Sequence, residues 1–580
     1  MHTNYYRRSV FCVNLLYSHK MTEGSSQSHS SYAGRWVALV RGRVIAQGGT
    51  PEQALRASQS SRYKEKPEII FMPLPFSFSP LIDKIKDALP ADQEIYLVGG
   101  AVRDLLTSRP SPDFDFALPS NGISVARKVA NSLGAAFMPL DNERDTGRVI
   151  LTDQDGKRIF LDFATYRGTN PSTRFASGQS LEEDLRARDF TINAIAYNLR
   201  DNTIIDPMDG ANDIRAKVIR ACSPTSLSDD PVRILRGVRQ AAAFGFRIEK
   251  NTRELMKQAV SRIERISPER LRDEIFKMLN GPKAGASIHA LEMLGALSHL
   301  MPELLAMKGV EQSPPHVYDV WMHTLAVLDH LDQVISGLRV GYDADKTNDM
   351  FTGLLGLRLG RFRQQIGDHF AASLNADRSH RSLLFFAALY HDVCKLETKT
   401  IDETGRIRFF DNDVKGAEVA AQRAQAYNLS NDEIERLHAI IKHHMRIHSF
   451  ASRMEFNKQT PSRKAIYRFF RDNGKAGIDL ILLGLADLRA TRANELTLET
   501  WTAYLDVARI LLENYWERPE EVISPPRLLD GHELMKELNL RPGPFVGQLL
   551  EAIRENQAAG KIENREQALA FAREELAKIA

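Results

Sequence analysis

The stretch that decides the fold of the amino-terminal third is IYLVGGAVRDLLTSRPSPDFD, residues 95–115. Its apolar start predicts a buried strand, and Gly99-Gly100 predicts a tight turn after that strand. A short helical pattern follows, and a second strand then carries Asp113 and Asp115. Because residues i and i+2 of a strand point to the same face, we expect the two carboxylates to converge.

This combination suits phosphate chemistry. Backbone N–H groups at a Gly-Gly turn and at the start of the next helix can hold phosphate oxygens. Two carboxylates together with phosphates are typical ligands of Mg²⁺, and a pair of such ions can activate an attacking hydroxyl and stabilise a leaving pyrophosphate. A Gly-Gly pair or an Asp-x-Asp pair alone is more often a plain turn or a solvated loop, so the hypothesis depends on further motifs.

Three further motifs follow in order. Residues 188–198 read RDFTINAIAYN, residues 206–220 read DPMDGANDIRAKVIR, and residues 229–236 read DDPVRILR. With the first stretch, they resemble the class II tRNA nucleotidyltransferase and bacterial poly(A) polymerase family, over roughly residues 76–280. The resemblance implies template-independent addition of CMP and/or AMP from CTP and ATP to the 3′ end of tRNA or another RNA.

The resemblance also implies roles for individual residues. Asp113 and Asp115 are expected to bind Mg²⁺, and Asp162, in a strand predicted from Arg158 onward, is expected to be a third catalytic carboxylate. The residues expected to contact the nucleotide are Gly99, Gly100, Arg103, Arg188, Asp189, Asn193, Asp230, Arg233 and Arg236.

Asp230 and Arg233 provide a physical basis for the choice of base. Residues three apart share a face of a helix, so this pair is expected to present a carboxylate and a guanidinium together. Cytosine and adenine both carry an amino donor beside a ring-nitrogen acceptor, whereas uracil and guanine place a carbonyl there and leave polar groups unpaired. Asp229 stands where the family usually has Glu. The alternative interpretation is an ordinary surface helix with ion pairs.

The polar segment between Arg167 and Glu183 corresponds to the flexible loop of the family and looks short. In this family the loop is associated with the switch from adding C to adding A. The sequence therefore leaves open whether the product is CCA, CC, A alone or a poly(A) tail.

A second set of chemically suited residues lies downstream. His323, His391-Asp392 and Asp487 fall on predicted apolar helices, where imidazoles and carboxylates can ligate one divalent ion. Their order resembles the HD phosphohydrolase superfamily, over roughly residues 310–505, which implies a second divalent metal. Asn412 stands where relatives carry a His, and the match of His443-His444 to a further position is ambiguous. We therefore expect at most one metal here, and weak or absent hydrolysis.

The two resemblances imply an α+β fold. A nucleotidyltransferase head with a small mixed, polymerase-beta-like sheet is expected to precede all-helical neck, HD-like and tail domains. The predicted boundaries are 1–30, disordered; 31–75, a small α/β module of unknown role; 76–205, the head; 206–280, the helical nucleobase- and RNA-binding neck; 281–505, the HD-like domain; and 506–580, a helical RNA-binding tail. The true start, Met1 or Met21, is left open.

Composition agrees with this interpretation. The 580 residues carry a formal charge of only +3, so RNA contacts would depend on local arginine clusters. There is no run of apolar residues of membrane-spanning length, so no membrane partner is expected. The three scattered cysteines predict neither disulfides nor zinc, so a reducing cytoplasm is expected. No DNA partner is expected. The oligomeric state is not predicted. The alternatives are an HD-type hydrolase with a degenerate head, or a poly(A) polymerase.

Overall fold

The computed structural model describes residues 32, 34–60, 63–72, 80–89, 93–107, 109, 113–152, 156, 158–168, 180–342, 349–375 and 378–578. The chain forms two compact units: unit 1 is Met1–Arg233 with Phe244–Leu255, and unit 2 is Ile234–Ala243 with Met256–Ala580. The disorder expected for residues 1–30 and most of the predicted flexible loop lie outside the described residues. No helix in the described ranges has the length and apolar character needed to cross a membrane.

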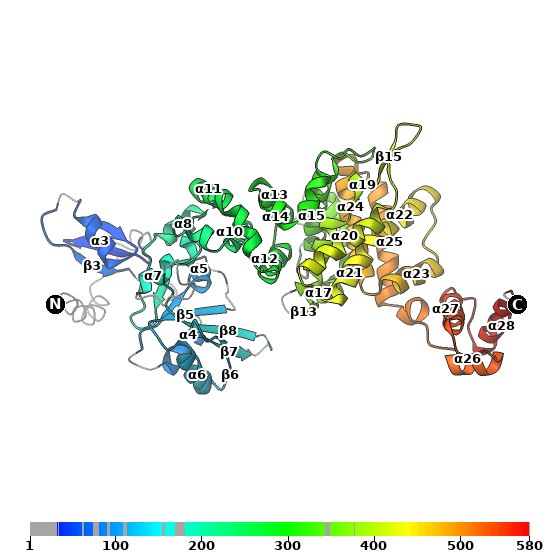
Figure 1. The fold of residues 1–580 in the computed structure, drawn as a ribbon, viewed down its shortest axis with the longest axis horizontal. Helices are drawn as coiled ribbons and strands as arrows, with labels where there is room; N and C mark the ends of the chain where they lie inside the picture. Colours follow the sequence, from blue (N-terminus) through cyan, green and yellow to red (C-terminus); the bar gives the residue numbers. More distant parts are fainter. Residues whose placement is uncertain are drawn as a thin grey trace. The chain divides into compact units, whose positions relative to one another are not determined.

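Unit 1 carries the mixed sheet (Figure 1). Its strands are β4 (Tyr96–Val98), β5 (Asp113–Leu118), β6 (Ala136–Asp141), β7 (Thr146–Thr152), β8 (Arg158–Thr165), β9 (Ala196–Asn198) and β10 (Ile204–Ile205). They are ordered β10-β9-β4-β5-β8-β7-β6, with β5 and β8 parallel and the other neighbours antiparallel. This confirms the mixed sheet that the motifs predicted.

The helices of unit 1 connect and cover these strands. They are α4 (Pro80–Ala88), α5 (Gly100–Leu106), α6 (Gly122–Leu133), α7 (Leu181–Arg186), the 3₁₀ turn η3 (Thr191–Asn193), α8 (Gly210–Ala216) and α9 (Ser226–Asp229). A short parallel pair, β11 (Val218–Ile219) with β12 (Arg247–Ile248), completes the unit. The helices α10 (Val232–Phe244) and α11 (Lys250–Ala259) each extend across the division between the two units.

Buried and exposed side chains alternate along β5, and this determines which face carries the carboxylates. Phe114 and Phe116 are buried while Asp113 and Asp115 are exposed, as the period of a half-buried strand requires. Phe116 stacks on Phe163 of β8 with ring centroids 4.6 Å apart. Burying such a ring contributes about 1.5–3 kcal/mol, which fixes the register of the strand. The packing that buries the phenyl rings therefore turns both carboxylates to the other face.

A second, smaller sheet precedes the head. β1 (Trp36–Val40) pairs with β2 (Arg43–Gly48) and β3 (Glu68–Phe71), and the helix α3 (Pro51–Ser58) connects β2 to β3. Thr50 caps this helix by accepting a hydrogen bond from the Gln53 backbone N–H. These strands and this helix agree with the small α/β module that was predicted for residues 31–75.

Unit 2 is almost entirely helical. Its first elements are η4 (Val260–Arg265), α12 (Pro268–Asn280), α13 (Ala284–Met293), α14 (Leu297–Leu300), η5 (Pro302–Met307), α15 (Val320–Gly337), α16 (Met350–Leu359), η7 (Gly360–Phe362), α17 (Arg363–Ala371) and α18 (His380–Tyr390). The next are α19 (Lys395–Thr398), α20 (Asn412–Ala426), α21 (Asn431–His443), α22 (Met445–Asn457), α23 (Arg463–Asn473), α24 (Ala476–Arg492), η8 (Ala493–Glu495), α25 (Leu498–Trp516) and the π-helical turn η9 (Pro519–Ile523). Two hairpins, β13 (Ser373–Asn375) with β14 (Arg378–Ser379) and β15 (Lys399–Ile401) with β16 (Ile407–Phe409), interrupt the helices.

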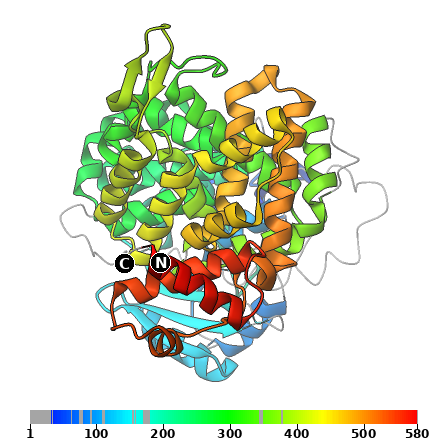
Figure 2. The same ribbon diagram turned by 90° about the vertical axis from the view of Figure 1, so that its right-hand side faces the viewer.

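The core of unit 2 forms around α15, α18 and α24, which pack against one another. Figure 2 shows the green, yellow and orange helices of this unit gathered in one bundle. These helices are apolar on nearly all sides, and a helix of that kind is stable only when it is buried on nearly all sides. Every residue of α18 except the half-buried Arg381 is buried. Polar residues on such helices therefore lie inside the bundle, where they need partners.

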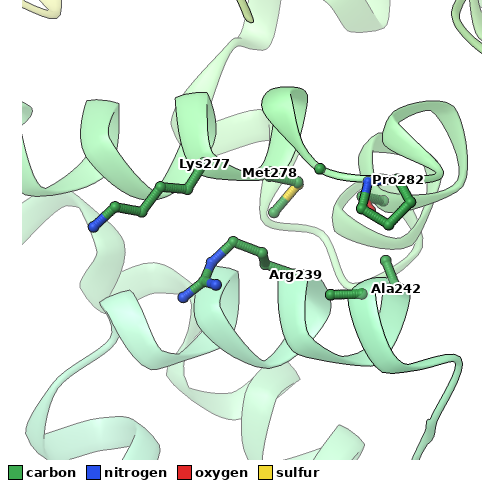
Figure 3. A pocket seen from close by; sticks show the side chains of 8 residues that line it. Arg239, Ala242, Lys277, Met278 and Pro282 are labelled. Atoms are coloured by element: carbon green, nitrogen blue, oxygen red, sulfur yellow. The ribbon is translucent and has the colours of Figure 1, made fainter. Parts of the chain in front are cut away.

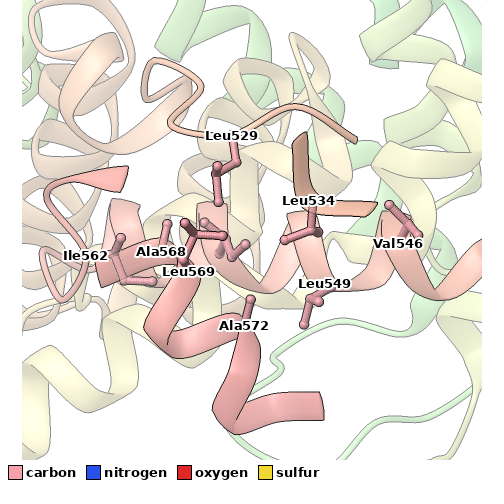
Figure 4. Close-up of a cluster of buried hydrophobic side chains, with 9 residues drawn as sticks. Leu529, Leu534, Val546, Leu549, Ile562, Ala568, Leu569 and Ala572 are labelled. Carbon is pink, nitrogen blue, oxygen red and sulfur yellow. The ribbon is translucent and has the colours of Figure 1, made fainter. Parts of the chain in front are cut away.

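The last three helices have a core of their own (Figure 4). They are α26 (Gly531–Leu538), α27 (Pro544–Ala558) and α28 (Arg565–Ala577). Leu534, Leu549 and Ala572 are among the buried residues at their centre. Pro544 occupies the first turn of α27, where its missing N–H costs no helical hydrogen bond. The helical character of this tail was predicted.

Candidate active site and candidate metal centre

The two carboxylates of β5 lie on the exposed face of the head. Asp115 pairs in register with Val98 on one side and with Asp162 of β8 on the other. Partial loss of hydration raises the pKa of Asp115, repulsion from Asp162 and Asp113 adds to this effect, and the guanidinium of Arg188 opposes it. A bound cation would relieve the repulsion, so these residues fit a divalent metal.

Gly99 brings the turn into contact with this site. Its φ of +76° favours glycine, and a Cβ at this position would lie 3.0 Å from Nη1 of Arg188 and 3.4 Å from Oδ2 of Asp115. The absence of a side chain thus lets the β4–α5 turn approach both an arginine and a metal-type carboxylate. Gly100 begins α5 next to it.

Arg188 is held rigidly beside the turn. Its Nε and Nη2 atoms donate to Oδ2 of Asp184 at 3.0 and 2.9 Å. Asp184 is buried and the Arg188 side chain is 10% exposed. Burial alone would raise the pKa of Asp184, but the charges and hydrogen bonds of Arg188 and Arg167 together lower it. Arg167, whose backbone N–H donates to Asp184 at 2.9 Å, adds a second positive charge near Asp115. Arg167 was not among the predicted site residues.

A hydrogen-bond chain connects the other predicted nucleotide contacts. Oδ1 of Asp189 accepts from the Nδ2 of Asn193 at 2.9 Å. Oδ1 of Asn193 accepts from Nη1 of Arg103 at 2.6 Å, and Arg103 lies over the Phe244 ring at 4.4 Å. The structure therefore brings Arg103, Asp189 and Asn193 together, as the motif order implied.

Asp162 is on the expected face but is paired. Arg148 of β7 donates from Nε and Nη2 to the two carboxylate oxygens of Asp162, each at 2.7 Å. Asp115, Asp162 and Arg148 are consecutive cross-strand neighbours in the sheet. The sequence did not point to Arg148, because its position depends on the register of β7 against β8.

Asp230 is not on the helix that carries Arg233, so the expected shared helix face is wrong. α9 ends at Asp229 and α10 begins at Val232. Pro231 explains the break, because the residue before a proline is disfavoured in the helical conformation, and Asp230 has φ −142° and ψ 89°. Oδ2 of Asp230 is still 4.0 Å from Nε of Arg233.

The guanidinium of Arg233 is used mainly on the backbone. Nη2 donates to the carbonyl of Ala187 at 2.8 Å, and Nη1 donates to that of Arg188 at 3.2 Å and to Oγ of Ser226 at 2.9 Å. Arg233 thereby holds the segment that carries Arg188. Arg236 lies in unit 2, where its Nε is 3.4 Å from Glu274.

Unit 2 contains the predicted second site. His323 of α15, His391 directly after α18, and Asp487 of α24 are buried and offer ligand atoms within 4.8 Å of one another. Nε2 of His323 is 3.1 Å from Oδ1 of Asp487. Asp392 lies beside them, 3.1 Å from Nε2 of His391. All four predicted residues are therefore in one place.

Asp392 is surrounded by positive and donor groups. Nζ of Lys395 is 2.7 Å from its Oδ2, and Nδ2 of Asn412 donates to its Oδ1 at 3.2 Å. The neighbouring His391 and Lys395 hold the pKa of this carboxyl well below its ordinary value despite its burial. Asn412, in place of the usual His, thus orients Asp392 through its amide.

Three histidines add to this site. Nε2 of His448 is 2.8 Å from Oδ2 of Asp487, Nε2 of His444 is 3.9 Å from Oδ1 of Asp392, and the His316 ring is 5.4 Å from that of His323. His443 lies elsewhere, with Nδ1 2.6 Å from the amide oxygen of Asn473, which resolves the ambiguous pair in favour of His444. The i,i+4 spacing of His444 and His448 was a signal that the sequence reasoning missed.

The donor set fits one divalent ion. Both ring nitrogens of His323, and Nε2 of His391 and of His448, are buried and make no contact with hydrogen-bond geometry, although each Nε2 lies 2.8–3.1 Å from a carboxylate oxygen. Buried polar atoms normally have partners, so this group of unpartnered nitrogens is suited to a metal. Burial lowers the pKa of His323, and it lowers that of His444 to about 4, which keeps both rings in the neutral form that metals bind.

A small basic pocket lies in the first part of unit 2 (Figure 3). It has a volume of about 170 Å³ and lies between α10 and α12, lined by Arg239, Lys277, Met278 and Pro282, among others. Nε of Arg239 donates to Glu274 at 2.8 Å.

Comparison with known proteins places these regions. The family described as "Poly A polymerase head domain" matches residues 95–220, and the "Probable RNA and SrmB-binding site of polymerase A" matches residues 245–308. The HD domain matches residues 357–475, and the putative tRNA nucleotidyltransferase domain 2 matches residues 522–572. A solved CCA-adding enzyme with CTP shares the fold, with a TM-score of 0.54 and 21% identity over 86% of this chain and 96% of that chain.

Two curated relatives match most of the chain. The A-adding tRNA nucleotidyltransferase of Deinococcus radiodurans is 32% identical over 82% of this chain and 94% of its own length. The CC-adding tRNA nucleotidyltransferase of Thermus thermophilus is 30% identical over 84% of this chain and 93% of its own length. Similarity at this level across nearly the whole length of both relatives covers the head and the helical domains alike, and the chain therefore belongs to the tRNA nucleotidyltransferase family.

Proposed function

We propose that this protein adds CMP and/or AMP, from CTP and ATP, to the 3′ end of tRNA without a nucleic-acid template. The observation that carries the proposal is the approach of the Gly99 backbone to Asp115 and Arg188 on the exposed face of the head. The relatives named as A-adding and CC-adding enzymes support both nucleotides as substrates.

The carboxylates of Asp113 and Asp115 would hold Mg²⁺, which would supply positive charge to the triphosphate. The RNA 3′-hydroxyl would attack the α-phosphate and lose its proton, while the bond between the α- and β-phosphates breaks and pyrophosphate leaves. Asp162 stands beside Asp115 in the sheet, but its charge is shared with Arg148. We infer that Asp162 mainly orients this part of the sheet and sets the charge around Asp115.

The backbone and Arg188 would bind the triphosphate. A phosphate can approach Gly99 and Gly100 closely because a side chain is absent, and Nη1 of Arg188 lies at the same point. Asp184 fixes the guanidinium through two hydrogen bonds, so little rotational freedom is lost when an anion binds. The chain of Arg103, Asn193 and Asp189 is the proposed support for the sugar and base.

For base choice we propose that Asp230 and Arg233 have different roles. The carboxylate of Asp230 would accept from the amino group of cytosine or adenine, a group that uracil and guanine lack at that position. Arg233 would contribute by holding the Asp230 carboxylate and the Ala187–Arg188 backbone, since both its terminal nitrogens already donate to main-chain or Ser226 oxygens. Changing Arg233 should then lower activity with all nucleotides together.

The test uses three tRNA transcripts, ending before CCA, after the first two cytidines, and after the complete CCA. Each is incubated with one labelled nucleoside triphosphate and the full-length protein. CMP incorporation on the first transcript identifies C addition, AMP incorporation on the second identifies A addition, and long A tails on the third identify poly(A) synthesis. Incorporation of neither CMP nor AMP on any transcript would refute the proposal.

We further propose that the HD-like site binds one divalent metal ion. The unpartnered nitrogens of His323 and His391 support it. The test is metal content by mass spectrometry of wild type and His391→Ala, with the exposed His289→Ala as a matched control. Loss of metal only in His391→Ala supports the site, and equal content in all three refutes it. Because Asn412 cannot act as a base, little phosphate release from 2′,3′-cyclic and 2′-phosphate substrates is expected.

A further inference from the structure

The small sheet of residues 34–72 lies outside the matched families, the first of which begins at residue 95. Within unit 1 it contacts the segment from Ile204 to Asp209, which leads into α8 (Figure 1). We define residues 34–72 as the N-terminal module.

The N-terminal module forms hydrogen bonds to the main chain of this segment. Nε1 of Trp36 donates to the carbonyl of Ile204 at 2.7 Å, and Nε2 of Gln53 donates to that of Pro207 at 2.6 Å. The backbone N–H of Asp206 donates to the carbonyl of Gly49 at 2.7 Å. A Cβ on Gly49 would lie 1.7 Å from the carbonyl oxygen of Asp206, so the approach is possible only for glycine.

Arg35 adds a buried charge to this contact. Its side chain is only 5% exposed, and Nη1 lies 2.5 Å from Oδ1 of Asp209 and 3.7 Å from Oδ2 of Asp206. Asp206 is fully buried. An isolated buried carboxylate is costly, and burial raises the pKa of Asp206 to about 6. The N–H groups of Ala211 and Gly210 and the charge of Arg35 all favour its ionised form.

The ionised Asp206 in turn holds α8. Its Oδ1 accepts from the backbone N–H of Gly210 at 2.7 Å and its Oδ2 from that of Ala211 at 2.9 Å. α8 lies directly against η3, since a Cβ on Gly210 would be 2.1 Å from the carbonyl oxygen of Thr191. Oγ1 of Thr191 also donates to Asp213 of α8 at 2.7 Å.

The turn η3 ends at Asn193, the residue that connects Asp189 to Arg103. A continuous set of contacts therefore runs from Arg35 through Asp206, α8 and η3 to the nucleotide-contacting group. We propose that the N-terminal module is a positioning element for the nucleotide site, with Arg35 as its main residue. This inference rests on the proposed function for the identity of the site. The contacts from Arg35 to Asn193 are independent of the proposed function.

The experiment compares the full-length variants Arg35→Ala and Arg35→Lys with Arg41→Ala. Arg41 belongs to the same module, but its ion pair with Glu65 is largely exposed, so it reports on the module's surface alone. Two quantities are measured: amide hydrogen exchange across residues 187–215, and KM and kcat for CTP and ATP alongside KM for tRNA.

We expect Arg35→Ala to speed exchange at residues 189–193 and at Gly210 and Ala211. We also expect it to raise the nucleotide KM by about tenfold with the tRNA KM unchanged, because displacement of positioning groups is costly in binding sites. Arg35→Lys should restore part of both effects, and Arg41→Ala should match wild type.

Unchanged exchange in residues 187–215 of Arg35→Ala would overturn the inference. Faster exchange with unchanged nucleotide KM would also overturn it, because the module would then be only a structural cover. If the wild-type protein transferred no nucleotide, the proposed function would fail. Hydrogen exchange with and without CTP or ATP would then test the positioning role by itself. Weaker protection by the nucleotide in Arg35→Ala than in Arg41→Ala would support that role, and equal protection would overturn it.

Discussion

Replacing Gly99 by alanine should damage the active site in two ways. The backbone at Gly99, with φ +76° and ψ −133°, is one that L-residues adopt at a cost of about 1–3 kcal/mol. The new Cβ would also lie 3.0 Å from Nη1 of Arg188, tighter than an ordinary contact. Arg188 cannot move away without weakening its hydrogen bonds to Asp184, and a hydrogen bond to a charged group contributes about 1.5–3 kcal/mol.

We therefore expect Gly99→Ala to lower kcat/KM for CTP and ATP at least about tenfold, equivalent to about 1.4 kcal/mol of transition-state stabilisation. The assay is single-nucleotide incorporation on tRNA transcripts, with the free energy of unfolding measured in urea. Gly134→Ala is the matched control, because Gly134 also has positive φ (+61°) but a Cβ there meets nothing within 4 Å. Both variants should lose stability, and only Gly99→Ala should lose activity. Equal activity of the two variants would refute the reasoning.

Three more predictions concern the head and the helical unit. Asp113→Ala should abolish incorporation while circular dichroism stays unchanged, and wild-type turnover would remove Asp113 from the metal site. Phe116→Ala should lower the free energy of unfolding of the head by about 3–5 kcal/mol in urea, because it leaves a cavity against the Phe163 ring; a loss below about 1 kcal/mol would contradict the packing. Burial and the charge of Arg436 lower the pKa of His380 to about 4. Between pH 6.5 and 4, His380 is therefore protonated in the unfolded chain but stays neutral in the folded chain. The free energy of unfolding should fall as pH drops through that range, and His380→Asn should make the fall shallower; an unchanged slope would contradict the assignment.

Local patterns were sufficient for the parts of the fold that depend on alternation and turn chemistry. The period of two along β5 buries Phe114 and Phe116 and exposes Asp113 and Asp115, and it is visible in four consecutive residues. The module of residues 34–72 was likewise predictable, because each of its elements has its own propensity and turn signal. The metal-type residues of unit 2 were predicted from their apolar helical surroundings and from their order, which resembles the HD superfamily.

The features that sequence reasoning missed depend on partners that the chain brings in from a distance. Arg148 faces Asp162 only because β7 pairs with β8 in one particular register, and a shift by one residue would turn it to the other face. The i,i+4 spacing of His444 and His448 indicates a shared helix face, but the contact of His448 with Asp487 depends on the packing of α22 on α24. The helix break at Asp230 is different, because it could have been predicted from Pro231 in the sequence. A proline disfavours the helical backbone conformation in the residue before it, and this outweighs the helical spacing of Asp230 and Arg233. The same break separates the two roles, since it leaves Asp230 on a connecting segment while Arg233, inside α10, holds the backbone of Ala187 and Arg188.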